Sequence, residues 1–263
     1  MDRFGLDWEQ VADEAAAFIR ERMAVARRDA VVIGLSGGID SAVSAFLSAR
    51  AVGTDGLTAF MLPYRTSSER SLADARLVAE ALGAPQEVIE ITPMVDEYFE
   101  RYADAGRMRR ANMMARQRMA VLYDQSERLG ALVVGTGNLT EALLGYTTLW
   151  GDMACAFNPI GDLYKTQVGR LAAYLGVPEP VRTKPPTADL WQGQTDEGEL
   201  GFTYEEADRI LVRLTDDLKT VEEVAAEGFD EGVVARVQSM MEASAFKRCM
   251  PPAPSLRDVL PEG

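Results

Sequence analysis

Apolar positions follow two different periods along the first half of the chain. They recur at helical spacing over residues 11–26, 71–83 and 113–129, and they form short runs of strand length at 31–35, 56–63, 87–92 and 131–136. Strands that alternate with helices predict right-handed βαβ units and a parallel sheet covered on both faces. We therefore predict an α/β fold with an open parallel sheet flanked by helices, as a single domain over residues 1–263.

The pattern changes after Pro159. Residues 183–201 are polar and rich in proline and glycine, which is typical of a loop or a mobile lid. Helical spacing returns over 204–214 and 231–243, and residues 250–263 form an irregular tail. The predicted domain thus has an N-terminal helix before the first strand and a C-terminal helical segment with a tail.

Composition narrows the classes of partner. The 263 residues are 47% hydrophobic, enough for a proper core, and 27 Lys and Arg against 41 Asp and Glu give a net charge of −14. A surface this negative repels a phosphate backbone, so we expect no nucleic-acid partner. No run of about 20 apolar residues exists, and the first ten residues lack the pattern of a signal peptide. We expect a cytoplasmic protein without a membrane span.

Histidine is absent, and the two cysteines, Cys155 and Cys249, lie far apart without metal-ligand spacing. These facts argue against a disulfide framework, a zinc site and histidine-dependent hydrolase mechanisms. Any bound metal ion is therefore expected to be a hard cation on oxygen ligands.

The clearest candidate for chemistry is the turn Ser36-Gly37-Gly38, which follows the first strand and precedes a helix expected from about Ser41. Backbone N–H groups and the positive end of that helix would form an anion site there. No lysine follows the glycines as in a Walker loop, and no G-x-G-x-x-G is present. Asp40 cannot itself attract phosphate, so its useful role would be to hold Mg²⁺. The alternative is that Ser36 or Asp40 simply caps the helix.

The string from Ser36 to Ser41 reads S-G-G-x-D-S, which resembles the pyrophosphate loop (PP-loop) of the ATP-pyrophosphatase superfamily. Members of that superfamily cleave ATP between its α- and β-phosphates. From Asn112 onward the chain also resembles the NAD synthetase family. The matching strings lie at 112–119, 135–141, 145–152, 158–168, 184–201 and 246–252. The resemblance implies a Rossmann-like fold of the adenine nucleotide alpha hydrolase type.

The resemblance also implies roles for individual residues. Asp40 and Lys165 would be catalytic, Asp40 and Glu141 would hold Mg²⁺, and Arg116 and Lys247 would contact deamido-NAD. The residues implied for ATP binding are Gly34, Leu35, Ser36, Gly37, Gly38, Ile39, Asp40, Ser41, Thr136, Lys165 and Thr187. Three roles have a plainer alternative: Glu141 as a first-turn helix carboxylate, Arg116 as a surface cation, and Lys165 as a solvated charge.

The implied reaction is the ATP-dependent amidation of deamido-NAD to NAD. The substrate carboxylate would attack the α-phosphorus to give an acyl-adenylate and pyrophosphate, and ammonia would then displace AMP. The segment before Val31 is too short for an amidohydrolase domain, so the donor is expected to be free ammonia or ammonia from a separate partner. Family resemblance further implies a homodimer.

Three positions depart from some ammonia-dependent members of the family. Leu149, Ala156 and Phe246 stand where those members have lysine, aspartate and histidine near the substrate. Two alternatives therefore remain: a paralogous PP-loop amide ligase that acts on a different carboxylate, and a nucleotide-binding protein without catalysis.

Overall fold

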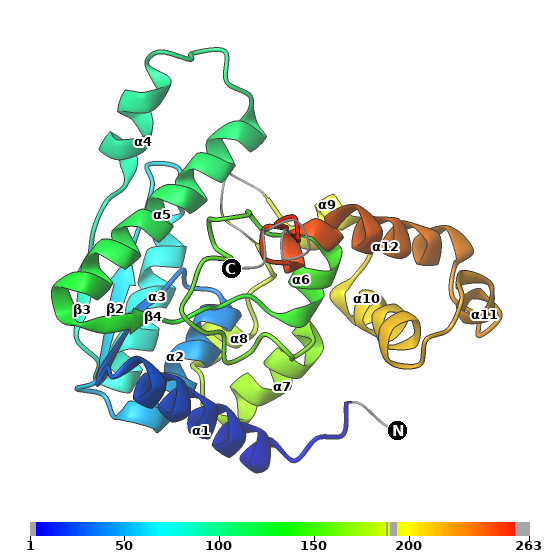
Figure 1. Ribbon diagram of the computed structural model, residues 1–263, viewed down its shortest axis with the longest axis horizontal. Helices are drawn as coiled ribbons and strands as arrows, with labels where there is room; N and C mark the ends of the chain where they lie inside the picture. Colours follow the sequence, from blue (N-terminus) through cyan, green and yellow to red (C-terminus); the bar gives the residue numbers. More distant parts are fainter. Residues whose placement is uncertain (1–3, 188, 190–193, 256–263) are drawn as a thin grey trace, which may run out of the picture.

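A computed structural model describes residues 4–187, 189 and 194–255 of the chain, and a parallel sheet lies at the centre of this part (Figure 1). Its strands are β1 (Ala30–Gly34), β2 (Leu57–Met61), β3 (Gln86–Val88) and β4 (Ala131–Val133), in the order β3-β2-β1-β4. Successive strands are added on one side of β1 up to β3, and β4 lies on its other side. The order therefore reverses between β1 and β4, which is where ligands bind in open α/β sheets.

Both faces of the sheet are covered, as predicted. Along β1 the side chains alternate: Val31 and Ile33 contribute to one buried cluster and Val32 to another. The first cluster is covered by α1 (Trp8–Ala26), α2 (Ile39–Val52), α3 (Glu69–Leu82) and α7 (Lys165–Tyr174). The second is covered by α4 (Thr92–Phe99) and α5 (Arg107–Leu129).

A group of helices with its own buried cluster lies beside the sheet layers, at the right of Figure 1. Its members are α6 (Leu139–Leu144), α10 (Tyr204–Leu211), a π-helical turn (Val212–Asp216), α11 (Val221–Ala225), α12 (Glu231–Ser244) and a 3-10 turn (Ala245–Arg248). Two short helices, α8 (Glu179–Arg182) and α9 (Asp196–Leu200), complete the described chain. Within the group, α10 and α12 pack against α6, which follows the strand β4 after a short loop, and α10 also packs against α7.

Local signals in the sequence explain several element boundaries. Asp7 accepts hydrogen bonds from the backbone N–H groups of Glu9 and Gln10, so α1 begins at Trp8. Gly83 ends α3 in the left-handed conformation, as the pattern predicted.

Three expectations need correction. The third strand is only Gln86–Val88 and all three residues are exposed, because it is the edge of the sheet rather than a buried strand. The helix after the glycine turn begins at Ile39, before the expected Ser41. The segment 183–201 is not wholly a loop, since α9 lies within it, while residues 188 and 190–193 fall outside the described chain.

No helix among the described residues combines the length and the apolar character needed to cross a membrane.

Candidate active site

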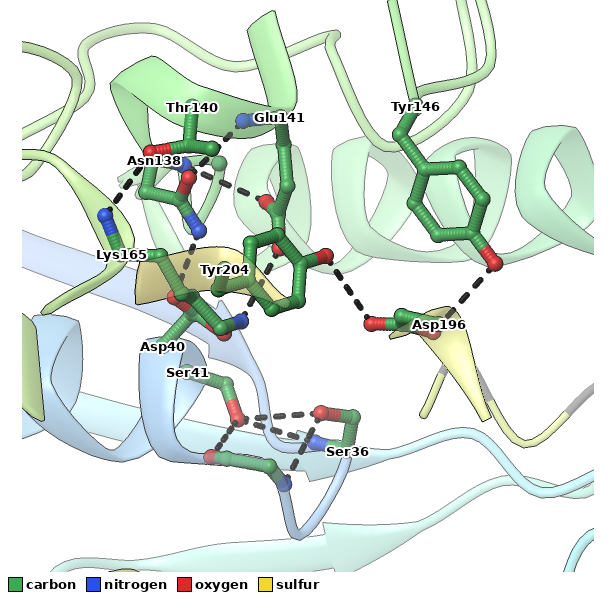
Figure 2. Close-up of polar contacts among 12 residues, drawn as sticks. Ser36, Asp40, Ser41, Asn138, Thr140, Glu141, Tyr146, Lys165, Asp196 and Tyr204 are labelled. Carbon is green, nitrogen blue, oxygen red and sulfur yellow. Dashed lines mark hydrogen bonds and ion pairs between the residues drawn. The ribbon is translucent and has the colours of Figure 1, made fainter. Parts of the chain in front are cut away.

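The glycine turn lies where β1 ends, next to the point at which the strand order reverses. Two serine hydroxyls hold the turn together. Ser36 Oγ accepts from the N–H of Gly38 (3.2 Å), and Ser41 Oγ donates to the carbonyl of Gly38 (3.0 Å) (Figure 2). Gly38 is the N-cap of α2 and supplies no side-chain acceptor, so neither Ser36 nor Asp40 caps this helix. The first N–H groups of α2 are therefore left for an anion.

Gly37 must be glycine for two reasons. Its φ of +76° lies in the left-handed region, and a Cβ at this position would lie 2.1 Å from the carbonyl oxygen of Ser71. Behind the turn, Lys184 pairs with the buried Asp74 (3.1 Å) and donates to Ser71 Oγ (2.9 Å). The turn is thus pressed against the start of α3, and a buried ion pair holds that start in place.

Asp40, Glu141 and Lys165 come together from three helices, although 125 residues separate the first from the last. Lys165 Nζ lies 2.5 Å from Asp40 Oδ2 and 3.1 Å from Glu141 Oε1. Figure 2 shows the lysine side chain between the two carboxylates. The lysine residue is only 8% exposed, so Lys165 is not the solvated charge of the plainer alternative, and the structure brings these three predicted site residues together.

One cation between two carboxylates leaves the cluster with an excess negative charge. Burial raises the pKa of Glu141 to about 7, although the nearby Lys165 opposes this shift. Burial alone would lower the pKa of the Lys165 ammonium, but the two carboxylates outweigh it and raise that pKa. Lys165 is therefore a permanent cation, while Glu141 can exchange a proton near neutral pH.

Asn138 was not identified from the sequence, yet it joins the two carboxylates. Its Nδ2 donates to Asp40 Oδ1 (2.8 Å), and its backbone N–H donates to Glu141 Oε2 (3.3 Å). Asn138 and Glu141 form a capping box at the start of α6, since Asn138 Oδ1 accepts from the N–H of Glu141 (2.9 Å). The N-x-x-E spacing in the sequence was the available signal.

A cavity of about 330 Å³ opens beside this cluster. Thr136, just after β4, and Thr187 both line it, and Thr187 Oγ1 also accepts from the N–H of Asp189 (3.1 Å). The remaining predicted ATP-binding residues on its wall are Gly34, Leu35, Ser36, Gly38, Ile39, Asp40, Ser41 and Lys165. Gly37 lies outside the lining and acts through the shape of the turn.

The two residues predicted to contact deamido-NAD lie outside this cavity lining. The Arg116 guanidinium donates to the carbonyl of Leu149 (3.2 and 3.3 Å). Lys247 Nζ donates to the carbonyls of Gly145 (2.9 Å) and Thr147 (2.8 Å). Arg116 on α5 and Lys247 in the 3-10 turn thus both contact the loop 145–152. The structure does not bring these two cations together with the cluster around Lys165.

The donor set fits Mg²⁺. Asp40 and Glu141 face one point, which the ammonium of Lys165 occupies. Among the described residues, no three His, Cys, Asp or Glu side chains gather to hold a metal ion. Mg²⁺ is commonly held by one or two carboxylates together with substrate phosphates, and the glycine turn beside this pair is shaped for phosphate.

A model of the family described as NAD synthase matches residues 11–251. The chain belongs to the NAD synthase family. It is 51% identical over 251 residues to the NH(3)-dependent NAD(+) synthetase of Trichlorobacter lovleyi, covering 95% of this chain and 92% of the relative.

Two solved structures extend the comparison to the fold. One is described as an NMN synthetase from Francisella tularensis, with a TM-score of 0.85 and 31% identity over 95% of this chain and 99% of that one. The other is an NH3-dependent NAD synthetase from Campylobacter jejuni in complex with the nitrate ion. Its TM-score is 0.82, with 33% identity over 95% of this chain and all of that one.

Leu149, Ala156 and Phe246, the three positions that depart from some members of the family, are not part of the carboxylate–lysine cluster. Leu149 contributes its carbonyl to Arg116, and Phe246 is 62% exposed. The three departures thus leave the residues of the carboxylate–lysine cluster unchanged.

Proposed function

We propose that the protein catalyses the ATP-dependent amidation of deamido-NAD with ammonia, releasing NAD, AMP and pyrophosphate. The observation that carries the proposal is the cluster of Asp40, Glu141 and Lys165 beside the glycine turn, at the crevice between β1 and β4. The name of the relatives, NH(3)-dependent NAD(+) synthetase, supports ammonia as the nitrogen donor and NAD as the product.

The first step is adenylation. The carboxylate of the nicotinate ring attacks the α-phosphorus, and the bond from that phosphorus to the oxygen bridging to the β-phosphate breaks. Negative charge moves onto the departing pyrophosphate. The free N–H groups at the start of α2 and the Lys165 ammonium are positioned to stabilise this charge.

Asp40 and Glu141 are the residues that would hold Mg²⁺. The ion would supply charge neutralisation at the phosphate oxygens. Lys165 contacts both carboxylates, so its ammonium would share them with the ion and would add a second positive charge next to the glycine turn.

In the second step, the nitrogen of ammonia attacks the carbonyl carbon of the acyl-adenylate. AMP leaves with the electron pair of the acyl C–O bond, and the new amide loses one proton. The direct donor would be free ammonia, or ammonia delivered by a separate partner. A homodimer is part of the same proposal, and sedimentation velocity would measure it.

A second candidate is amidation of a mononucleotide acid, with NMN as product. The Francisella tularensis structure with the TM-score of 0.85 is described as an NMN synthetase, which favours this candidate. The departures at Leu149 and Ala156 also fall where recognition of the acid is expected. The 51% identity to an NAD synthetase favours the dinucleotide.

One assay separates these candidates. The protein is incubated with ATP, Mg²⁺, ammonium and either deamido-NAD or its mononucleotide counterpart, and the amide product, AMP and pyrophosphate are quantified. We expect NAD, AMP and pyrophosphate in equal amounts. Release of ADP and orthophosphate would contradict the chemistry, turnover of the mononucleotide alone would favour the second candidate, and no turnover with either acid would favour a nucleotide-binding protein.

A further inference from the structure

Asp208 is a fully buried carboxylate that the proposed chemistry does not use. It lies on α10, in the helical group beside the sheet layers, and its exposed fraction is 0%. Oδ1 accepts from Thr140 Oγ1 (2.5 Å), and Oδ2 accepts from both the N–H (2.8 Å) and the Oγ1 (2.6 Å) of Thr166. A buried carboxylate needs such partners, because an unpaired one carries a large desolvation cost.

The partners of Asp208 lie on two different helices, each next to a residue of the cluster. Thr140 precedes Glu141 in the first turn of α6, and Thr166 follows Lys165 in the first turn of α7. Thr140 Oγ1 also accepts from the backbone N–H of Lys165 (2.9 Å), as Figure 2 shows. One carboxylate therefore ties together the two helix starts that carry Glu141 and Lys165.

A second residue of the same helix contacts the head of the lysine. Tyr204 lies one turn before Asp208, and its ring centroid is 5.1 Å from Lys165 Nζ. The Tyr204 hydroxyl donates to Asp196 Oδ2 (3.1 Å), so the ring is held from its far side. Helix α10 thus contacts Lys165 at its ammonium through Tyr204, and at its backbone through Asp208 and Thr140.

From these contacts we infer that Asp208 is a positioning residue, which sets the separation between the Lys165 ammonium and the Asp40–Glu141 pair by holding the starts of α6 and α7 in register. The inference rests on the proposed function for its catalytic meaning. A carboxylate that only caps a helix accepts hydrogen bonds from the start of that one helix. Asp208 instead accepts from donors on two helices, α6 and α7, which carry residues of the cluster.

The requirement for a carboxylate follows from the donor count. Three hydrogen-bond donors point at Asp208, and the carboxylate is the acceptor in each of these contacts. An asparagine in its place would direct N–H groups toward one of the threonines, so the hydrogen bond donated by that threonine hydroxyl would be lost. A small displacement of reacting groups costs on the order of 10²-fold in rate.

The variant Asp208→Asn tests the inference. We expect kcat for AMP formation to fall by about 10²-fold, with little change in the KM for ATP because the turn of Ser36 and Ser41 is not touched by Asp208. Thr166→Val, which removes one donor and keeps the backbone N–H, should give a smaller fall.

Thr203→Ala is the matched control. It removes the N-cap of the same helix, where Thr203 Oγ1 accepts from the N–H of Glu206, without contacting α6 or α7.

A second readout uses the ligand-free protein. Competitive acetylation of lysines, quantified by mass spectrometry, should find Lys165 protected in the wild type and in Thr203→Ala, and more reactive in Asp208→Asn and Thr166→Val. Wild-type kcat and wild-type protection in Asp208→Asn would overturn the inference. The inference would also be overturned if kcat fell in proportion to the melting temperature, and to the same extent, in both Asp208→Asn and Thr203→Ala. If the wild type made no NAD, the proposed function would fail, and the acetylation result would still decide whether Asp208 positions Lys165.

Discussion

At the scale of single residues, the site depends on two carboxylates and one ammonium that are largely buried from water. The Lys165 side chain is 9% exposed, and those of Asp40 and Glu141 are 17% and 16% exposed. Charges this deep interact strongly because little water screens them. The cluster therefore holds one ammonium firmly and retains the capacity to bind further positive charge.

Replacing Asp40 with asparagine should abolish most of the adenylation while the fold persists. The change removes one of the two carboxylates available to Mg²⁺ and the 2.5 Å partner of Lys165, so kcat should fall by about 10³-fold. Measurement of AMP and pyrophosphate release checks the rate, and circular dichroism checks the fold. Asp13→Asn, which loses only an exposed pair with Arg50 far from the cluster, is the control. Retained activity in Asp40→Asn would contradict the assigned metal role.

The stability of the ligand-free protein should depend on pH through Glu141. Burial raises its pKa to about 7 from a reference of 4.5, so the folded state takes up a proton that the unfolded state has released. The stabilisation from this proton is fully present below about pH 4.5 and is lost as the pH rises through about 7. The free energy of unfolding of the wild type, relative to Glu141→Gln, should therefore fall by roughly 3 kcal/mol between these limits. Urea unfolding of both proteins at several pH values measures it, and a constant difference would contradict the shift.

At the scale of elements, the sequence predicted the long amphipathic helices better than the short helices. The amphipathic patterns of α1, α3, α5, α10 and α12 are long enough to be seen in the sequence, and caps such as Asp7 and Gly83 mark their ends. The six-residue α6 is shorter than two turns, so it shows no period, and α7 was missed behind the turn that precedes Lys165. Glu141 does lie in the first turn of a helix, as its plainer alternative held, but periodicity showed neither α6 nor α7, so the approach of Glu141 and Lys165 to Asp40 could not be derived from local patterns.

The glycine turn is the element whose backbone conformation is most restrictive, and Gly37→Ala should damage it. The added methyl group would meet the Ser71 carbonyl at 2.1 Å in addition to the cost of a positive φ, which is about 1–2 kcal/mol for a residue with a Cβ. We expect a raised KM for ATP and a lower melting temperature. Gly53→Ala is the matched control at the other end of α2: its φ is +75°, and nothing lies within 4 Å of its added Cβ. Equal effects of the two substitutions on ATP binding would contradict the role of the close contact.

At the scale of the whole molecule, the site lies where the sheet layers meet the helical group. Asp40 comes from the helix after β1, whereas Glu141 on α6 and Asp208 on α10 both come from the helical group beside the sheet. The strand order reverses between β1 and β4, so the connections diverge and leave the crevice open. The helical group then closes one side of that crevice.

The net charge of −14 should make stability depend on ionic strength. Like charges repel in the compact state, and the Debye length falls from about 30 Å at 0.01 M salt to about 8 Å at 0.15 M. We expect the melting temperature at pH 7.5 to rise over this range of NaCl, as followed by scanning calorimetry. At pH 5.5, where fewer carboxylates are ionised, the rise should be smaller. An equal rise at both pH values would point to a cause other than charge.

The sequence by itself determined the alternation of strands and helices, the parallel sheet and the glycine turn at Ser36–Ser41, and family strings singled out Asp40, Glu141 and Lys165 as candidates. Those properties are local, because periodicity, turn residues and short motifs depend on neighbours along the chain. Only the tertiary structure decided that Lys165 lies between the two carboxylates, that Asn138 and Asp208 hold them in place, and that Arg116 and Lys247 contact a different loop. These contacts join residues as far apart as 125 positions, and their distances depend on how helices pack, which no local pattern contains.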